Sequence, residues 1–351
     1  MTNSRMRNTG DAIGRDGPGS VQTELDLERR IGGLGIEVDR PIRVIDLADP
    51  SATQAETDAE LWSAALESGF FQIIGHGIDT AAIDDAFEAA AAFFALSIDE
   101  KSRWAMPPGT NSGWEFKSQK RPSTGTFDQK ETYQVTLPRM GPLGLWPDDA
   151  DLPGFESTLR SFEARNRDVA MRVLSSFARK LGFDDEFFAE RHDPSSPHYQ
   201  STLRLLHYLP LDIDELPPDQ WRAGAHSDFD CLTLLHQREG QRGLQVCPGA
   251  AAADPSEPLG WTEIEPVAGA ITCNIGDMLM RWSDDQLPST LHRVRMPRPD
   301  EATDGRVGPR YSIAYFAQAD RDAIIESPSG RHAPITAADY LRQRIEANFA
   351  P

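Results

Sequence analysis

The sequence predicts a mainly β protein with flanking α-helices, built as one domain. Short runs rich in β-branched and aromatic residues, separated by turn signals, fill the stretch from about residue 202 to residue 316. Segments with an apolar residue every three to four positions, which indicate amphipathic helices, precede and follow that stretch. No internal repeat and no second core divides the 351 residues. A sandwich, a jelly roll or a barrel agrees with this pattern.

The chain before residue 39 is rich in Gly, Asn, Arg and Ser and lacks the apolar segment of a secretory signal. We therefore expect a flexible tail over residues 1–38, within which Val21–Ile31 could form a short helix. Strands and helices alternate in residues 39–150. The expected elements are a strand at Ile42–Ala48, a helix at Glu56–Ser68, a strand at Gly69–Ile78 and a helix at Thr80–Leu96.

The span Pro107–Asp151 is thick with Gly, Pro, Ser and Thr, and we expect it to be loop. The longest helical stripe follows at Phe155–Leu181, where Gly182 provides the stop. Residues 200–318 hold the strand-like runs LRLLHYL, CLTLLHQ, GLQVC, WTEIEPV, AITCNIGDMLMRW, TLHRVRM and RYSIAYF. A helical segment over residues 319–351, with its last helix at Ala337–Asn348, completes a single domain over residues 39–351.

The charge of the chain restricts its partners. Thirty-five basic and 55 acidic residues give a formal net charge of −20, and no basic run is present. Nucleic acid and anionic membranes attract Lys/Arg patches, so we expect neither as a partner and expect a small-molecule substrate instead. Three cysteines at no metal-finger spacing fit a reducing, cytoplasmic location. The oligomeric state stays open.

The stretch HSDFDCLTLLH, which begins at His226, carries the first chemical signal. On a strand, residues i and i+2 share a face, so His226 and Asp228 are expected to project together. His292 in TLHRVRM is the candidate third ligand. Two histidines and one carboxylate leave coordination positions open, as in non-haem Fe(II) oxygenases. An isolated H-x-D pair is more often a structural contact, and Asp277 in NIGDML has the pattern of a turn residue.

The run RYSIAYF strengthens the functional interpretation. Arg310 and Ser312 also stand at i and i+2, and they offer a guanidinium and a hydroxyl on one strand face. A buried arginine is costly unless an anion partners it, so this pair suits a carboxylate clamp.

The order of these motifs resembles the isopenicillin N synthase-like family of Fe(II)/2-oxoglutarate-dependent oxygenases. The likeness extends from Ile42 to Phe349, nearly the whole chain. It includes IRVIDLA, GFFQIIGHGI, FFALSIDEK, SGW, DQKETYQV, LRLLHYLP, GLQV, NIGDMLMRWSDDQLPSTLHRV and RYSIAYF. The resemblance implies a double-stranded β-helix (jelly-roll) core, with Fe(II) bound by His226, Asp228 and His292.

The same resemblance implies 2-oxoglutarate as co-substrate and O₂ as oxidant. Arg310, Ser312 and Tyr208 would bind the distal carboxylate, and Arg204 is a further candidate because relatives often carry a basic residue there. The implied reaction oxidises an unactivated C–H bond of a small molecule by hydroxylation, desaturation or cyclisation, in specialised metabolism. A family oxidase that needs no 2-oxoglutarate and a non-catalytic ligand-binding relative are the alternatives.

Five aromatic residues are candidates for the substrate pocket, although core packing is the ordinary role of each. They are Trp114, Phe116, Phe127, Tyr133 and Phe316.

Overall fold

The structure is a computed structural model, and it describes residues 36–118, 127–213, 221–247 and 260–349. The expected tail over residues 1–38 lies outside the described residues except for its last three, and the expected helix at Val21–Ile31 lies wholly outside them.

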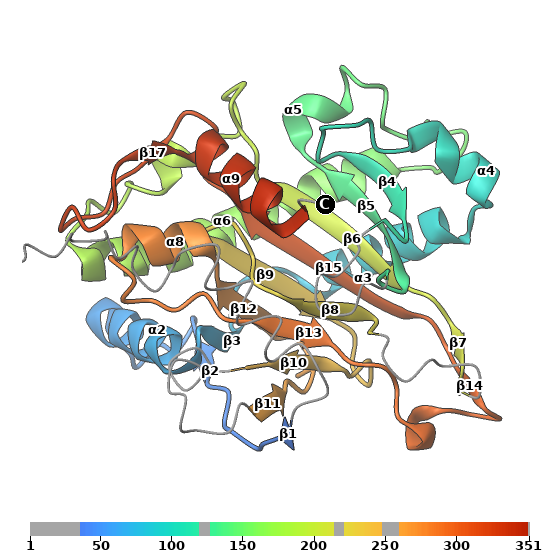
Figure 1. The fold of residues 1–351 in the computed structure, drawn as a ribbon, viewed down its shortest axis with the longest axis horizontal. Coiled ribbons are helices and arrows are strands. Elements are labelled where there is room, and N and C mark those ends of the chain that lie inside the picture. The colour runs from blue at the N-terminus through green and yellow to red at the C-terminus, as the bar shows by residue number, and fades with distance from the viewer. Residues whose placement is uncertain (1–35, 119–126, 214–220, 248–259, 350–351) are drawn as a thin grey trace, which may run out of the picture.

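An eight-stranded sheet forms the centre of the molecule, in the order β2-β3-β12-β9-β15-β6-β5-β4 (Figure 1). Only β2 and β3 pair in parallel within it, and the other neighbours are antiparallel. Its strands are β2 (Val44–Asp46), β3 (Phe70–Ile74), β4 (Gly113–Phe116), β5 (Lys130–Val135), β6 (Thr202–Tyr208), β9 (Leu232–Gln237), β12 (Ile271–Ile275) and β15 (Arg310–Ala317).

A second sheet has five strands, of which β10, β11 and β1 lie in the lower part of Figure 1. Its strands, in spatial order, are β1 (Ile36–Glu37), β11 (Gly260–Glu263), β10 (Leu244–Val246), β13 (His292–Val294) and β8 (Ala223–His226). From β8 onward the chain moves back and forth between the sheets: β9, β12 and β15 belong to the large sheet, and β8, β10, β11 and β13 to the small one. This alternation is the jelly roll that the resemblance implies.

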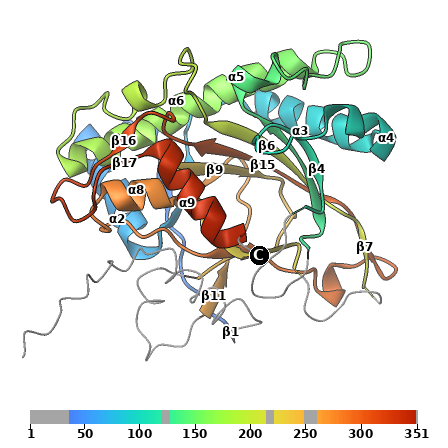
Figure 2. The same ribbon diagram turned by 45° about the horizontal axis from the view of Figure 1, so that its top comes forward.

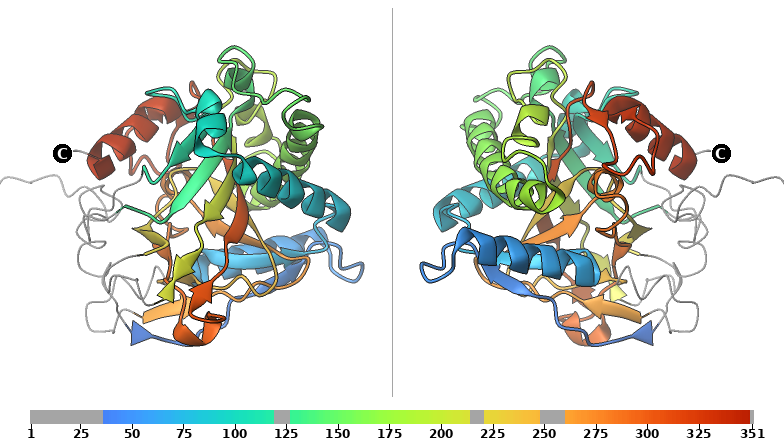
Figure 3. Two further views of the ribbon diagram at one scale, coloured as in Figure 1. Left: turned by 90° about the vertical axis from the view of Figure 1, so that its right-hand side faces the viewer. Right: turned by 90° about the vertical axis from the view of Figure 1, so that its left-hand side faces the viewer.

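The long helices form where apolar periodicity predicts them. They are α2 (Gln54–Ser68), α3 (Thr80–Ala95) and α6 (Phe155–Leu181). Thr53 caps the start of α2, and Gly69 ends it with φ 71°, a conformation that costs glycine little. Helices α3 and α6 cover the outer face of the large sheet (Figure 2), and α2 packs against α6 (Figure 3). Buried phenylalanines such as Phe93, Phe162 and Phe177 fill the space between helices and sheet.

The remaining elements are short, apart from the C-terminal helix α9 (Ala337–Phe349), which confirms its prediction. They are α4 (Ile98–Lys101), α5 (Leu137–Met140), α8 (Asp277–Trp282), 3₁₀ turns at Ser102–Trp104, Ala189–Arg191 and Pro299–Glu301, the pair β7 (Leu211–Asp212) with β14 (Arg306–Val307), and the pair β16 (Ile324–Ile325) with β17 (Ile335–Thr336). Among the helices of the described residues, none combines the length and apolar character needed to cross a bilayer.

The structure corrects three expectations. The span Pro107–Asp151 is not only loop, because β4 and β5 extend the large sheet within it. The stretch HSDFDCLTLLH is not a strand where Asp228 stands, because β8 ends at His226 and β9, in the other sheet, begins at Leu232. The run AITCNIGDMLMRW is a strand followed by helix α8, whose first residue is Asp277. In each case tertiary packing decided what local sequence left ambiguous.

The pleat gives the large sheet two distinct faces. Cross-strand register aligns Gln134, Arg204 and Ala314 on one face. Their neighbours in sequence point to the opposite face, which the helices cover. The first face looks across to the small sheet and encloses the interior of the jelly roll, and we call it the interior face.

Candidate metal centre

Two histidines and an aspartate converge at one end of the jelly roll. His226 ends β8, and His292 begins β13 directly opposite it in register, with ring centroids 4.3 Å apart. Asp228 lies in the turn after β8, with Oδ1 3.8 Å from Nε2 of His292. One ligand atom from each residue lies within 4.8 Å of the other two, and no second such group of three is found among the described residues.

The geometry corrects the reason for this convergence. Asp228 follows β8, so it does not share a strand face with His226 as the i, i+2 spacing predicts. Two side chains of the large sheet hold the carboxylate instead. Thr233 Oγ1 and Asn274 Nδ2 donate to Asp228 Oδ2 over 2.6 and 2.8 Å. With Oδ2 engaged, Oδ1 remains directed towards His292.

The histidine rings are oriented by backbone carbonyls. Nδ1 of His226 lies 2.7 Å from the carbonyl oxygen of Gly224, and Nδ1 of His292 lies 3.3 Å from that of Thr290. A carbonyl only accepts, so these contacts assign the proton to Nδ1 and leave Nε2 as the donor atom for a metal. Phe70 packs edge-on against His292 with ring centroids 5.4 Å apart. Two neutral imidazoles and one carboxylate suit Fe(II).

A second carboxylate lies close behind the first. Burial raises the pKa of Asp230 well above its ordinary value, and the charge of Asp228 raises it further. Oδ2 of Asp230 lies 3.0 Å from Oγ1 of Thr233, and Asp230 is 2 % exposed. It therefore belongs to the packing beneath the triad.

The candidate carboxylate clamp forms on the interior face. Arg310 begins β15 opposite Tyr208 of β6, and its guanidinium stacks on the Tyr208 ring at 4.6 Å. Arg310 is 2 % exposed, and its Nε donates to the carbonyl oxygens of Gln241 and Arg242. Its NH1 finds no hydrogen-bond partner among the described residues. Burial lowers the pKa of Arg310. A buried guanidinium with an unused donor fits a ligand carboxylate, and Ser312 lies two residues on, on the same face.

A second arginine at the clamp is absent from the sequence prediction. Arg222, just before β8, is 5 % exposed and donates to the carbonyl of Gly308 over 3.2 Å. Burial and the neighbouring Arg310 lower its pKa to about 10. The two arginines line one cavity of about 200 Å³. The signal available in the sequence was a charged residue in the apolar run that leads to His226.

Arg204 does not join the clamp, which corrects its expected role. It stands four residues before Tyr208 on β6, a separation of roughly 13 Å at the rise of a strand. Its NH2 donates to Gln134 Oε1 over 2.8 Å, and its guanidinium lies 4.7 Å from the ring centroid of Phe316. Arg204 and Phe316 therefore form a separate cation–aromatic pair on the interior face.

Three of the five aromatic candidates lie on the helix-covered face, so the structure corrects their expected pocket role. Trp114 pairs with Tyr133, and Phe116 follows on the same face of β4. Trp114 Nε1 donates to Glu131 over 2.7 Å, and the Tyr133 ring packs 4.4 Å from that of Phe93. Tyr133 and Trp114 are core residues, and Phe116 is 39 % exposed.

The other two aromatic candidates differ from each other. Phe127 lies at the surface, 49 % exposed. Phe316 lies on the interior face opposite Thr233 of β9. Among the five aromatic candidates, it is the one that the strand registers place on the same face as Thr233, which donates to Asp228.

Comparison with known sequences agrees with this geometry. Residues 42–149 match the family model described as the N-terminal region of non-haem dioxygenases in morphine synthesis, and residues 199–319 match that of the 2OG-Fe(II) oxygenase superfamily. A proline hydroxylase of Petromyces alliaceus, buaE, is 33% identical over 286 residues, covering 77% of this chain and 83% of its own. The 2-oxoglutarate-dependent dioxygenase htyE of Aspergillus rugulosus is 31% identical over 291 residues, with the same coverage of 77% and 83%.

Solved structures show the same architecture. A full-length Neurospora crassa protein solved in complex with alpha-KG superimposes with a TM-score of 0.74 at 28% identity, covering 87% of this chain and 95% of that one. A putative 2OG-Fe(II) oxygenase family protein from Caulobacter crescentus gives a TM-score of 0.71 at 29% identity, with coverage of 87% and 98%. The chain belongs to the isopenicillin N synthase-like superfamily of 2OG-Fe(II) oxygenases, and it is an Fe(II)/2-oxoglutarate-dependent dioxygenase.

Proposed function

We propose that His226, Asp228 and His292 bind the Fe(II) of this dioxygenase through two imidazole Nε2 atoms and one carboxylate oxygen. Their mutual approach within 4.8 Å is the observation that carries the proposal. When bound, Fe(II) with 2-oxoglutarate and O₂ supplies the oxidising power to attack an unactivated C–H bond. The chain supplies a three-sided cradle, which leaves the remaining positions for co-substrate and O₂.

The clamp residues would hold the distal carboxylate of 2-oxoglutarate. Arg310 offers its unused NH1, Ser312 a hydroxyl two residues away, and Tyr208 a phenol opposite. Arg222 adds a second buried positive charge beside Arg310. A buried guanidinium without an acid partner costs free energy unless an anion completes the site. This feature favours use of 2-oxoglutarate over an oxidase that does without it, and over a non-catalytic relative.

The substrate would lie over the interior face beside the metal ligands. Phe316 opposes Thr233, and Thr233 donates to Asp228. Phe316 and Arg204 together offer a flat apolar ring and a cation. We infer a small molecule that pairs an apolar or ring portion with an anionic or hydrogen-bond-accepting group. A relative named proline hydroxylase supports this class, because an amino acid carries such a carboxylate.

We also propose a metabolic role and a cellular location for the protein. Several similar proteins are fungal 2-oxoglutarate-dependent oxygenases, which supports a role in specialised metabolism. Cys231, Cys247 and Cys273 are buried and unbridged, which supports a reducing, cytoplasmic location. The strong negative charge supports a small-molecule partner over nucleic acid or membrane. We place the start of the oxygenase domain at residue 36 and not at residue 39, because β1 pairs with β11 in the small sheet.

Turnover tests the proposed chemistry directly. The protein, loaded anaerobically with Fe(II) and 2-oxoglutarate, is mixed with O₂ and a panel of amino acids and cyclic carboxylic acids. We expect O₂ consumption and succinate formation that rise with a matching compound. Absence of both in a protein shown to bind Fe(II) and 2-oxoglutarate would favour the ligand-binding alternative.

A further inference from the structure

The C-terminal helix reaches the metal centre through a buried ion pair. Arg344 of α9 is 1 % exposed, and its NH2 lies 2.5 Å from Oδ2 of Asp277, which is fully buried at the start of α8. We propose that Arg344 and Asp277 form a brace that positions the turn after β8, which carries Asp228, and that α9 thereby supports the metal site. This inference rests on the proposed role of Asp228 as an iron ligand.

The brace contacts the ligand turn at two points. Arg344 NH2 donates to Oγ of Ser227 over 3.3 Å, and Ser227 stands between the two ligands in sequence. The backbone N–H of Asp277 donates to the carbonyl oxygen of Asp228 over 2.9 Å. The side chain of Asp277 thus pairs with Arg344 of α9, while the backbone N–H of Asp277 binds the backbone carbonyl of Asp228.

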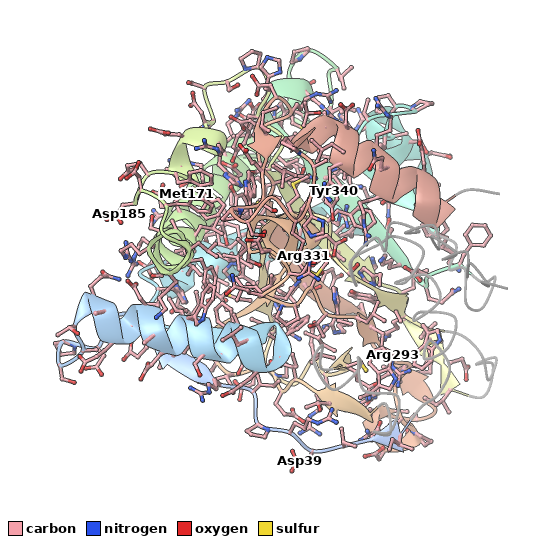
Figure 4. All side chains as sticks on the ribbon, turned by 60° about the vertical axis from the view of Figure 1, so that its left-hand side comes forward. Asp39, Met171, Asp185, Arg293, Arg331 and Tyr340 are labelled. Atoms are coloured by element: carbon pink, nitrogen blue, oxygen red, sulfur yellow. The ribbon has the colours of Figure 1, made fainter. Side chains whose placement is uncertain are left out.

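Further contacts fix α9 and α8 against this turn. Tyr340, labelled in Figure 4, stands one helical turn before Arg344, and its Oη donates to the carbonyl oxygen of Asp277 over 3.4 Å. The Arg344 guanidinium lies 5.3 Å from the ring centroid of Phe229, the residue after Asp228. A Cβ at Gly276 would come within 2.2 Å of the carbonyl oxygen of Asp230, so only glycine permits this approach of α8 to the turn.

The location of Asp228 explains why a brace is needed. His226 and His292 are fixed by the ladder between β8 and β13. Asp228 stands outside the ladder, so its position depends on the contacts of the turn together with those of Thr233 and Asn274. A buried ion pair adds little net stability compared with apolar packing. Its placement against the turn that carries Asp228 indicates that Arg344 positions this ligand.

Metal affinity tests the brace without relying on turnover. Dissociation constants for Fe(II) under anaerobic conditions, and for Co(II) as a spectroscopic probe, are measured on folded protein. We expect Arg344→Met to weaken both by about 10- to 100-fold, the range found when partners of metal ligands are removed. Arg344→Lys should recover part of the loss. Arg342→Met is the matched control, because Arg342 lies on the same helix and its side chain is 65 % exposed; we expect it to leave affinity unchanged.

A double variant separates positioning from stability. Arg344→Met alone leaves the buried Asp277 carboxylate without its partner, and this variant can fail to fold for that reason. The double variant Asp277→Asn with Arg344→Met removes both charges, so it leaves no buried charge unpaired. The inference predicts that metal affinity stays low in this folded double variant. Wild-type affinity in the double variant, or in a folded Arg344→Met, would overturn the brace. Asp228→Ala distinguishes a failure of the brace from a failure of the proposed metal site. If Asp228→Ala retains wild-type metal affinity, the proposed metal site itself is wrong.

Discussion

Asn274 of the large sheet donates a 2.8 Å hydrogen bond to Asp228, which lies in the turn after a strand of the small sheet. The metal centre is therefore assembled across both sheets of the jelly roll. The small sheet carries the two histidines, and the large sheet orients the carboxylate through Asn274 and Thr233.

Removal of this support should weaken metal binding. We expect Asn274→Ala and Thr233→Val each to raise the Fe(II) dissociation constant by about 10- to 100-fold, because Asp228 loses a donor that fixes its orientation. Isothermal titration under anaerobic conditions measures the change. Thr272→Val is the control, because Thr272 lies on the same face of β12 and donates to Gln237 and not to Asp228. Equal affinity in all three variants would contradict this account.

The two buried arginines should contribute unequally to co-substrate binding. Arg310→Gln removes the clamp cation, and we expect 2-oxoglutarate affinity to fall by at least about 30-fold, or about 2 kcal/mol. Arg222→Gln should cost less, about 10-fold, because Arg222 acts beside the clamp. Equilibrium binding of labelled 2-oxoglutarate to the Fe(II) protein reports both. Arg43→Gln, at a side chain that is 44 % exposed and paired with Glu67 away from the clamp, should change nothing. If Arg310→Gln binds normally, the clamp assignment fails.

Arg204 should affect substrate and leave the co-substrate untouched. The register places it roughly 13 Å from Tyr208 along β6. We therefore expect Arg204→Gln to keep the 2-oxoglutarate dissociation constant within about twofold of wild type while substrate-stimulated succinate formation falls by about 10-fold or more. A loss of 2-oxoglutarate affinity like that of Arg310→Gln would restore the original expectation for Arg204.

His236 should make the protein less stable in mild acid. It is fully enclosed beside Asn166, whose Oδ1 lies 2.7 Å from its Nε2, and burial lowers its pKa from 6.5 to about 3. Below pH 6.5, His236 binds a proton in the unfolded chain but stays neutral in the folded chain. The free energy of unfolding therefore has its full value above pH 6.5 and decreases as the pH falls towards 3. Urea unfolding at about pH 7, 5.5 and 4.5 should show this decline. We expect His236→Gln to have a shallower slope, and an identical slope would contradict the assignment.

Motif order and residue type in the sequence indicated the candidate triad and the candidate clamp. The convergence of His226, Asp228 and His292 followed from residue types, although Asp228 reaches the site by a turn that the i, i+2 rule does not describe. Trp114 and Tyr133 were misplaced because aromatic residues near a Gly-rich span do not reveal which sheet face they occupy. That face became visible only when β4 and β5 were seen to join the large sheet.

Long-range partners explain the remaining gaps. Arg344 lies 67 residues after Asp277 on an ordinary amphipathic helix, so nothing local marks their ion pair. Asp277 had the pattern of a turn residue and is instead fully buried, because α9 provides its partner. The role of Arg222 likewise depends on its closeness to Arg310, which lies on a strand of the large sheet far along the chain. The sequence alone does not predict this closeness.

The central claim is that the triad binds Fe(II) and that the clamp binds 2-oxoglutarate beside it. Its most direct test is an anaerobic titration with Fe(II) and then 2-oxoglutarate, monitored by visible absorption. We expect a weak charge-transfer band for the wild-type protein, no band for Asp228→Ala, and a band for Arg310→Gln only at much higher 2-oxoglutarate concentration. A wild-type protein that binds Fe(II) without developing the band, or an Asp228→Ala variant that retains it unchanged, would contradict the account.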